Sequence, residues 1–121
     1  MLNKKRILIV DDDTKIVELL KVTLEPTYNV LEAFDGREGL EKALAQLPDL
    51  ILLDVKMPGL DGFEVLKKLK QSAKTRAIPV IMLTAEAHTN SILRAQDGAA
   101  ADYAIKPISM STLLPFIRRY I

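Results

Sequence analysis

The sequence predicts an α/β domain in which helices cover both faces of a five-stranded parallel sheet. Uniformly apolar runs of four residues recur along the chain, which is typical of strands buried on both faces of such a sheet. Segments with helical periodicity separate these runs, so strands and helices alternate. Each run ends abruptly in polar side chains, at the edge where open α/β sheets bind their ligands. The apolar runs are Ile7–Val10, Leu50–Leu53 and Val80–Leu83.

The length of 121 residues fits one compact domain, and we expect residues 1–121 to form it without a linker or an internal repeat. The 17 basic and 16 acidic residues leave a net charge of +1, which argues against nucleic acid as a direct partner. The absence of cysteine excludes disulfides and thiolate metal sites. The basic stretch 3–6 precedes only four strongly apolar residues, too few for a signal peptide or a membrane span. A cytoplasmic location is therefore expected.

The first helix is predicted by its termini and by one apolar face. Asp13 or Thr14 can cap it after the strand 7–10, and Pro26 ends it at the preceding residue. Its expected apolar face comprises Ile16, Val17, Leu20 and Leu24. The segment 28–33 follows as a second strand that is more polar than the others.

Two amphipathic helices are predicted around the third strand. The first begins at Gly36 and ends before Pro48, with a buried stripe at the i, i+3, i+4, i+7 spacing. That stripe comprises Leu40, Ala43, Leu44 and Leu47. The third strand leads to Asp54, and the turn signal Asp61-Gly62 precedes the second helix. This helix is expected to bury Phe63, Leu66 and Leu69 and to expose Lys67, Lys68 and Lys70.

The last third of the chain predicts two more strand-helix pairs. Pro79 is tolerated at the start of the fourth strand because the hydrogen-bonded ladder has not yet begun there. A weakly patterned helix covers roughly 88–99, and 102–105 is the fifth strand. The last helix carries Leu113, Leu114, Ile117 and Tyr120. A start near Ser109 would place Pro115 in the helix interior, at a cost of about 3 kcal/mol. A start with Ser111 as the cap would place Pro115 in the first turn at little cost, and we prefer this later start.

The composition of the strands favours the order 2-1-3-4-5. The three apolar strands belong in the middle of the sheet, whereas 28–33 and 102–105 carry the polar side chains expected at edges. The order reverses between the first and third strands. Asp11, Asp12 and Asp54 therefore lie at the switch point where doubly wound sheets bind ligands.

Three carboxylates that converge in one crevice repel one another, so one must take a proton or a cation must lie between them. Mg²⁺ or Mn²⁺ suits such a site, because these ions bind carboxylate, carbonyl and water oxygens and can also hold a phosphoryl oxygen. Thr84 after the fourth strand and Lys106 after the fifth add a hydroxyl and an ammonium group to the same crevice.

Together these residues resemble the receiver domain of two-component response regulators, of the stand-alone chemotaxis-regulator type. The resemblance covers nearly the whole chain and implies a flavodoxin-like (βα)5 fold. It is carried by several motifs that occur in one order at one spacing. These are Asp11-Asp12, Asp54, Met57-Pro58-Gly59-Leu60-Asp61-Gly62, Thr84-Ala85, Tyr103 and Lys106-Pro107.

The resemblance implies that Asp54 takes a phosphoryl group from the phosphohistidine of a sensor histidine kinase or a histidine phosphotransfer protein. It assigns Asp12, Asp54 and the backbone carbonyl of Lys56 as direct ligands of Mg²⁺, with Asp11 acting mainly through water. It also implies a signalling domain that assists its own phosphorylation and dephosphorylation, rather than an enzyme.

Further roles are implied by the same resemblance. Thr84 and Lys106 would contact the phosphoryl group, and Tyr103 would move as Thr84 engages it. The family places a cis peptide bond after Lys106 and a partner-binding face on the fourth helix, fifth strand and fifth helix. It implies a downstream effector at that face and a monomer or weak dimer. Ala99 replaces the usual glycine, so the partner's identity does not carry over.

Lys56 and Glu86 occupy the positions two residues after Asp54 and Thr84. Opposite charges there are expected to form an exposed ion pair, worth about 0–1 kcal/mol in stability. Such a pair would obstruct the attack of water on an acyl phosphate and lengthen its lifetime. The alternative is two unrelated solvated charges.

Two other functions compete with this interpretation. The segment 7–14 satisfies the loose first motif of haloacid-dehalogenase-like phosphatases, with Asp11 as nucleophile. That hypothesis leaves Asp54 and the turn after it without a purpose, and such enzymes usually need a longer core. The other is a pseudo-receiver that binds partners without phosphorylation. It is weakened because all of the expected acids, the hydroxyl and the lysine are present.

Overall fold

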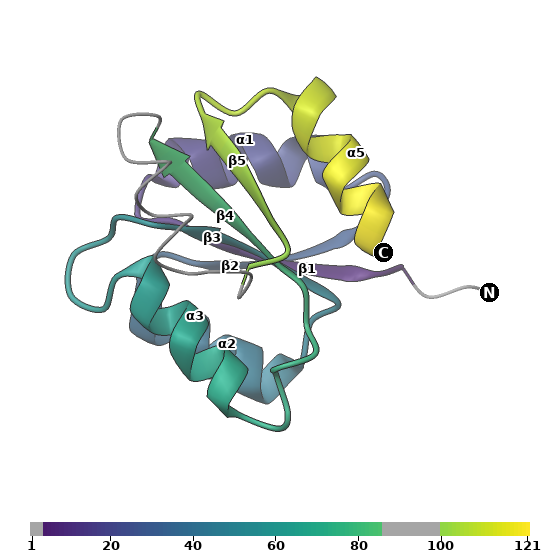
Figure 1. Ribbon diagram of the computed structural model, residues 1–121. Coiled ribbons are helices and arrows are strands. Elements are labelled where there is room, and N and C mark those ends of the chain that lie inside the picture. The colour runs from purple at the N-terminus through teal and green to yellow at the C-terminus, as the bar shows by residue number, and fades with distance from the viewer. Residues whose placement is uncertain (1–3, 86–99) are drawn as a thin grey trace.

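The computed structural model describes residues 4–85 and 100–121 and forms an α/β domain with one central sheet (Figure 1). The elements are β1 (Arg6–Val10), α1 (Thr14–Leu24), β2 (Asn29–Ala33), α2 (Gly36–Gln46), β3 (Leu50–Asp54), α3 (Gly62–Gln71), β4 (Val80–Ala85), β5 (Asp102–Lys106) and α5 (Met110–Tyr120). The helix predicted over 88–99 lies outside the described residues. Among the described helices, none is long and apolar enough to cross a membrane.

The sheet is parallel throughout and has the order β2-β1-β3-β4-β5, which confirms the predicted topology. The helices α2 and α3 cover one face, and α1 and α5 cover the other (Figure 1). Alternate strand residues therefore enter different cores. Val10 and Leu53 belong to the cluster beneath α2 and α3, whereas Ile9 and Leu52 belong to the cluster beneath α1 and α5. Burial on both faces explains the uninterrupted apolar runs.

The helix α1 begins and ends where its capping residues predict. The Asp13 carboxylate accepts hydrogen bonds from the backbone N–H groups of Lys15, at 3.0 Å, and Ile16, at 3.4 Å. Glu25 is the C-cap and Pro26 follows it. The side chains that α1 buries are Val17, Leu20 and Leu24.

The predicted stripe on α2 is only partly correct. Ala43 is buried and Leu40 is half-buried, but Leu44 and Leu47 are 37% and 47% exposed. The buried residues of α2 are instead Gly36, Gly39 and Ala43, and a Cβ at Gly39 would stand 2.7 Å from the Val10 side chain of β1. Leu47 lies past the end of α2, at the C-cap with a φ of 49°, so the helical stripe does not extend to it.

The helix α3 differs from its prediction at three positions. Phe63 is half-buried, and Val65 joins Leu66 and Leu69 in the core. Lys67 and Lys68 are exposed as expected. Lys70 is instead half-buried, because its Nζ donates hydrogen bonds to the carbonyl oxygens of Arg76, at 3.1 Å, and Ile78, at 2.9 Å. It thereby fastens the connection that leads into β4.

The last helix has the earlier of its two expected starts, so the preference for a start at Ser111 is wrong. The helix α5 begins at Met110 with Ser109 at the N-cap position, so Pro115 lies in the helix interior. The Ser109 carbonyl already accepts from the N–H groups of Thr112 and Leu113. Burial of Leu113 in the core shared with α1 favours this earlier start despite the proline.

Candidate functional site: an acidic crevice at the carboxyl ends of the strands

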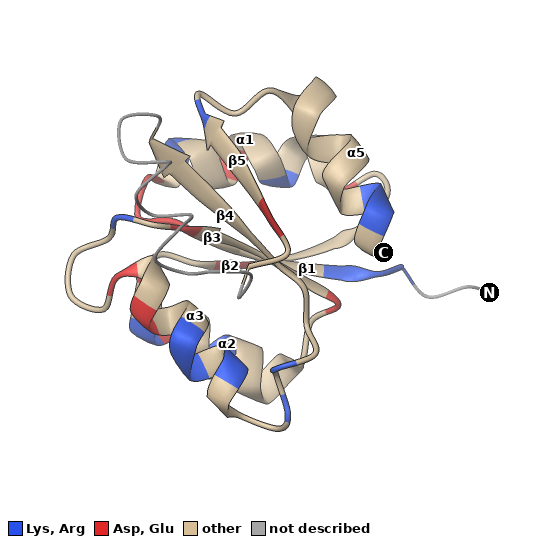
Figure 2. Cartoon of the chain, in the orientation of Figure 1, with Lys and Arg blue, Asp and Glu red and all other residues tan. Residues whose placement is uncertain are grey.

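Four strands deliver polar side chains to one end of the sheet. Asp11 and Asp12 follow β1, Asp54 ends β3, Thr84 lies near the end of β4 and Lys106 ends β5. In Figure 2, acidic residues mark the segments after β1 and the end of β3, with a basic residue at the end of β5. The sequence thus predicted correctly which residues share this edge, because parallel strands place all their carboxyl ends together.

The three carboxylates lie close enough to share a ligand. One oxygen from each of Asp11, Asp12 and Asp54 lies within 4.8 Å of the other two. Asp11 is fully buried and Asp54 is 5% exposed, whereas Asp12 is exposed. The Asp11 Oδ1 atom accepts a hydrogen bond from the Asp13 N–H at 3.0 Å, which fixes its orientation.

Lys106 lies between two of these acids. Its Nζ is 3.0 Å from Asp11 Oδ2 and 3.0 Å from Asp54 Oδ1. The contact with Asp11 Oδ2 is an ion pair without hydrogen-bond geometry, and this buried oxygen has no hydrogen-bond partner among the described residues. Sequence analysis missed this pairing, because it assigned the role of separating the carboxylates to a metal ion. The signal was present, since Lys106 was expected in the same crevice.

The carboxylates and Lys106 change one another's protonation. Burial raises the pKa of the Asp54 carboxyl from 3.8 to about 6; the Lys106 hydrogen bond opposes the rise, and the Asp11 charge adds to it. Burial alone would lower the pKa of the Lys106 ammonium group, but its close ion pairs with Asp11 and Asp54 raise that pKa above its ordinary value. Without another cation, the Asp54 carboxylate thus takes a proton more readily than an ordinary aspartate.

The loop between β3 and α3 packs against the backbone of Asp54. Gly59 adopts a φ of 77°, which favours glycine. Asp61 and Glu64 form a reciprocal capping box at the start of α3. The Gly62 N–H donates to the Val55 carbonyl at 2.8 Å, and a Cβ on Gly62 would stand 2.1 Å from the Asp54 carbonyl oxygen. The segment after Asp54 therefore forms a turn and also packs closely against the backbone of β3. The sequence predicted only the turn.

Thr84 and Tyr103 occupy neighbouring strands. Thr84 is 1% exposed, and its Oγ1 lies 3.3 Å from the Ala85 carbonyl oxygen, a weak hydrogen bond. Tyr103 is half-buried, and burial raises the pKa of its phenol. The buried Tyr103 hydroxyl has no hydrogen-bond partner within 4–85 and 100–121. The Lys106–Pro107 peptide bond is cis, as the resemblance implied.

Lys56 is exposed two residues after Asp54. Its expected partner, Glu86, lies outside the described residues, as do Ala99 and the fourth-helix part of the expected partner-binding face. On the described part of that face, Ile105 is 46% exposed, and the Arg119 guanidinium lies 5.6 Å from the centre of the Phe116 ring.

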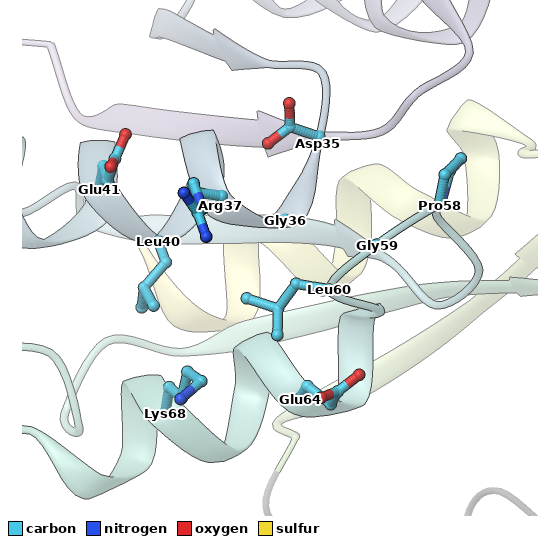
Figure 3. Close-up of a pocket in the computed structure, with 10 residues that line it drawn as sticks. All are labelled: Asp35, Gly36, Arg37, Leu40, Glu41, Pro58, Gly59, Leu60, Glu64 and Lys68. Carbon is cyan, nitrogen blue, oxygen red and sulfur yellow. The ribbon is translucent and has the colours of Figure 1, made fainter.

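A groove of about 870 Å³ lies beside the crevice, between α2, α3 and the loop that precedes α3 (Figure 3). Leu40 and Leu60 point between the two helices, with Arg37 and Lys68 at its sides. The groove contains none of the carboxylates of the acidic crevice, so it is a separate feature of the surface.

Comparison with known proteins agrees with this geometry. Residues 7–118 match the family model described as the response regulator receiver domain. Among curated relatives, the chain is 40% identical to the DNA-binding dual master transcriptional regulator RpaA of Synechocystis over 93% of the chain and 47% of the relative. It is 43% identical to the response regulator PleD of Caulobacter vibrioides over 93% of the chain and 25% of that protein. The chain thus spans half or less of the length of these relatives.

Solved structures show the same likeness along almost the whole chain. The Vibrio cholerae chemotaxis protein CheY4 superposes with a TM-score of 0.89 at 32% identity, covering 98% of this chain and 99% of that one. The response regulator TrrA of Thermotoga maritima, solved in complex with Mg²⁺-BeF, superposes with a TM-score of 0.85 at 36% identity, covering 97% and 99%. The five-stranded fold, the acidic crevice and these matches together establish that the chain belongs to the response regulator receiver domain family, whose members act as phosphoacceptor signalling domains.

Proposed function

We propose that Asp54 is the phosphoacceptor of this domain and that a divalent cation, Mg²⁺ or Mn²⁺, assists the transfer. One observation carries the proposal: Asp54 meets Asp11 and Asp12 within 4.8 Å and Lys106 at 3.0 Å, in a crevice open on the Asp12 side. This arrangement combines a nucleophile, a set of oxygen ligands and a mobile cation. The solved Mg²⁺-BeF complex of TrrA supports the same assignment by similarity.

The donor set fits a small hard cation. Oxygens that bind one Mg²⁺ at about 2.0–2.1 Å stand roughly 3–4 Å apart, so modest rotation of the exposed Asp12 completes the set. Asp12, Asp54 and the Lys56 carbonyl would be direct ligands, and Asp11 would act mainly through water. When bound, the ion would neutralise carboxylate charge and hold a phosphoryl oxygen.

The chemistry at Asp54 is a displacement at phosphorus. An Asp54 carboxylate oxygen forms the new O–P bond while the P–N bond to the donor histidine breaks, and the imidazole leaves with the electron pair and is reprotonated from solvent. Lys106 leaves its ion pair with Asp54 and contacts a phosphoryl oxygen, and the Thr84 hydroxyl donates to another. Tyr103, whose hydroxyl has no partner among the described residues, changes position in response.

Asp54 suits the role of nucleophile better than Asp11, the acceptor in the phosphatase alternative. Asp11 has no exposed surface, one oxygen accepts the Asp13 N–H and the other faces Lys106. A pseudo-receiver is disfavoured because Thr84 and Lys106 lie at the expected strand ends beside a complete acidic set.

Partners follow from the family rather than from this chain's own surface. The donor is a sensor histidine kinase or a histidine phosphotransfer protein, and an effector binds near β5 and α5. We also propose a cytoplasmic monomer or weak dimer that assists its own phosphorylation and dephosphorylation without turning over a separate substrate.

The test is labelling of the purified protein with a small phosphodonor, such as an acyl phosphate or a phosphoramidate, in the presence and absence of Mg²⁺. We expect one acid-stable, base-labile phosphoryl group per chain with Mg²⁺. Asp54→Asn should abolish it, and Asp102→Asn, at the opposite end of the sheet, should not. Sustained turnover would support the phosphatase, and no labelling of the native protein would support the pseudo-receiver.

A further inference from the structure

Gly36, at the start of α2, lies in an unexpectedly tight contact. Sequence analysis attributed Asp35-Gly36 to turn chemistry, and Asp35 does cap α2 by accepting the Glu38 N–H at 2.8 Å. The backbone of Gly36, however, does not have a positive φ. A Cβ at Gly36 would stand 2.2 Å from the Leu60 carbonyl oxygen and 2.9 Å from Val65 Cγ2. Close approach, rather than backbone conformation, therefore requires glycine here.

Leu60 belongs to the loop that begins immediately after the acceptor strand and returns to it. At the far end of this loop, Gly62 packs against the Asp54 carbonyl and hydrogen-bonds to the Val55 carbonyl. Contacts at Leu60 and Gly62 thus hold the loop between α2 on one side and β3 on the other. Figure 3 shows Gly36 beside the loop at Gly59 and Leu60.

We infer that Gly36 is a positioning residue for the acidic crevice. Because Gly36 has no side chain, the Leu60 carbonyl can pack against α2, and this contact determines the position of the loop that carries the Lys56 carbonyl. The inference rests on the proposed function, because the Lys56 carbonyl matters only if it binds the cation. It links β2 and α2, which contribute no side chain to the crevice, to the geometry of the site.

Gly36→Ala must displace backbone, because the nearest atom is a carbonyl oxygen and not the end of a flexible side chain. A misplacement of about 1 Å in a reacting group can cost on the order of 100-fold in rate. We expect Gly36→Ala to weaken Mg²⁺ affinity by about tenfold and to slow phosphorylation by a small donor at subsaturating Mg²⁺. Excess Mg²⁺ should recover much of the rate.

The experiment compares Gly36→Ala with Leu24→Ala, by Mg²⁺ titration calorimetry and by phosphorylation rate as a function of Mg²⁺. Leu24 is buried at the end of α1 in the opposite core, so it controls for lost stability. It should leave Mg²⁺ affinity within about twofold of the native value. An equal loss of affinity in both variants, or none in Gly36→Ala, overturns the inference.

A second comparison separates the loop from the core. Val65→Ala removes the side-chain part of the clash, so affinity restored in the Gly36→Ala, Val65→Ala double variant would assign the effect to core packing and overturn the inference. Persistent weak binding in the double variant supports it. If Gly36→Ala does not fold, Leu60→Gly loosens the same loop without added atoms, and unchanged Mg²⁺ affinity there overturns the inference. Absence of Mg²⁺ binding and labelling in the native protein would instead contradict the proposed function.

Discussion

Lys106 has two partners before any phosphoryl group arrives. Its ammonium lies 3.0 Å from both Asp11 and Asp54, so in this structure it is the cation that separates the two buried carboxylates. Burial raises the pKa of Asp54 to about 6, and the single charge of Lys106, shared with Asp11, does not fully offset this rise. The crevice is therefore electrostatically costly at neutral pH, which favours binding of an additional cation.

Asp54→Asn is expected to stabilise the metal-free protein at pH 7. Because the folded-state pKa of Asp54 is raised, the folded state binds more protons than the unfolded state between pH 4 and 6. The native protein therefore loses stability as pH rises through this window, and the variant does not. Urea unfolding in a chelator should show a gain of roughly 1–3 kcal/mol at pH 7.

The gain should shrink toward zero by about pH 3, below the ordinary pKa of 3.8, where Asp54 is mostly protonated in both the folded and the unfolded state. Mg²⁺ should stabilise the native protein and so reduce the difference in the free energy of unfolding between the native protein and Asp54→Asn at pH 7. An equal difference at both pH values would contradict the assigned cause, because a packing change does not titrate.

Thr84→Ala and Lys106→Ala are expected to permit some phosphorylation of Asp54 but to uncouple it from Tyr103. In the proposed mechanism both residues contact the new phosphoryl oxygens through hydrogen bonds and charge, so removing either would remove the signal and not the acceptor. The measurement is tyrosine fluorescence on phosphorylation. The chain has 3 tyrosines and no tryptophan, so Tyr103→Phe identifies the Tyr103 contribution. Native-like spectral changes in both switch variants would refute the coupling.

Among the elements, α5 retains a strained position. Pro115 lies inside the helix and is exposed, so it removes a backbone hydrogen bond to the Ser111 carbonyl without contributing a buried side chain. The helix forms because its other face buries Leu113 and Ile117 in the core. Packing thus outweighs local propensity here.

Pro115→Ala should raise the free energy of unfolding by roughly 1–3 kcal/mol, since alanine restores the hydrogen bond and removes the steric conflict. Chemical denaturation at constant pH measures the change. Pro26→Ala is the matched control, because Pro26 is exposed and follows the C-cap of α1. A gain no larger in Pro115→Ala than in the control would show that α5 already accommodates the proline without cost.

The loop after β3 also bears on the lifetime of the phosphoryl group. If Lys56 and Glu86 form a lid, Lys56→Ala and Glu86→Ala should each hydrolyse the acyl phosphate faster. The double variant should be little faster than either single one, as expected for coupled residues. Hydrolysis is followed at saturating Mg²⁺. Lys68→Ala, at an exposed lysine on α3, is the control, and unchanged rates in both single variants would leave two independent solvated charges.

For the molecule as a whole, one sheet contributes to both cores. The two hydrophobic clusters use alternate residues of the same strands. If the helices on one face unfolded, that apolar face of the shared sheet would be exposed to water. We therefore expect residues 1–121 to behave as one domain. Ligand binding at the strand ends should stabilise all of it together.

Mg²⁺ is expected to raise the melting temperature in a single transition that coincides by circular dichroism and tyrosine fluorescence. Asp12→Ala should show a much smaller shift, although Asp12 is exposed and its removal should alter stability little in a chelator. Equal Mg²⁺ shifts in both proteins would exclude Asp12 from the metal site. Two separate transitions would contradict the single domain.

The amino-acid sequence was sufficient for features decided by neighbouring residues. The apolar runs predict the strands, Asp13 predicts the start of α1, and the polar residues after each run predict which side chains meet at one edge, since parallel strands align their ends. The strand order followed from the polarity of the edge strands and from resemblance.

Other features depend on distances between segments remote in the chain. The Lys70 ammonium group donates to carbonyls beyond its own helix, and Leu47 is exposed at the left-handed C-cap beyond the end of α2. The helix α5 begins early, with Leu113 buried in a core shared with α1. The pairing of Lys106 with two acids and the contact of Gly36 with Leu60 likewise arise only when four strands and two helices are assembled. Local patterns specify which elements form, but side-chain partners are chosen by packing, because burial and charge act through space and not along the chain.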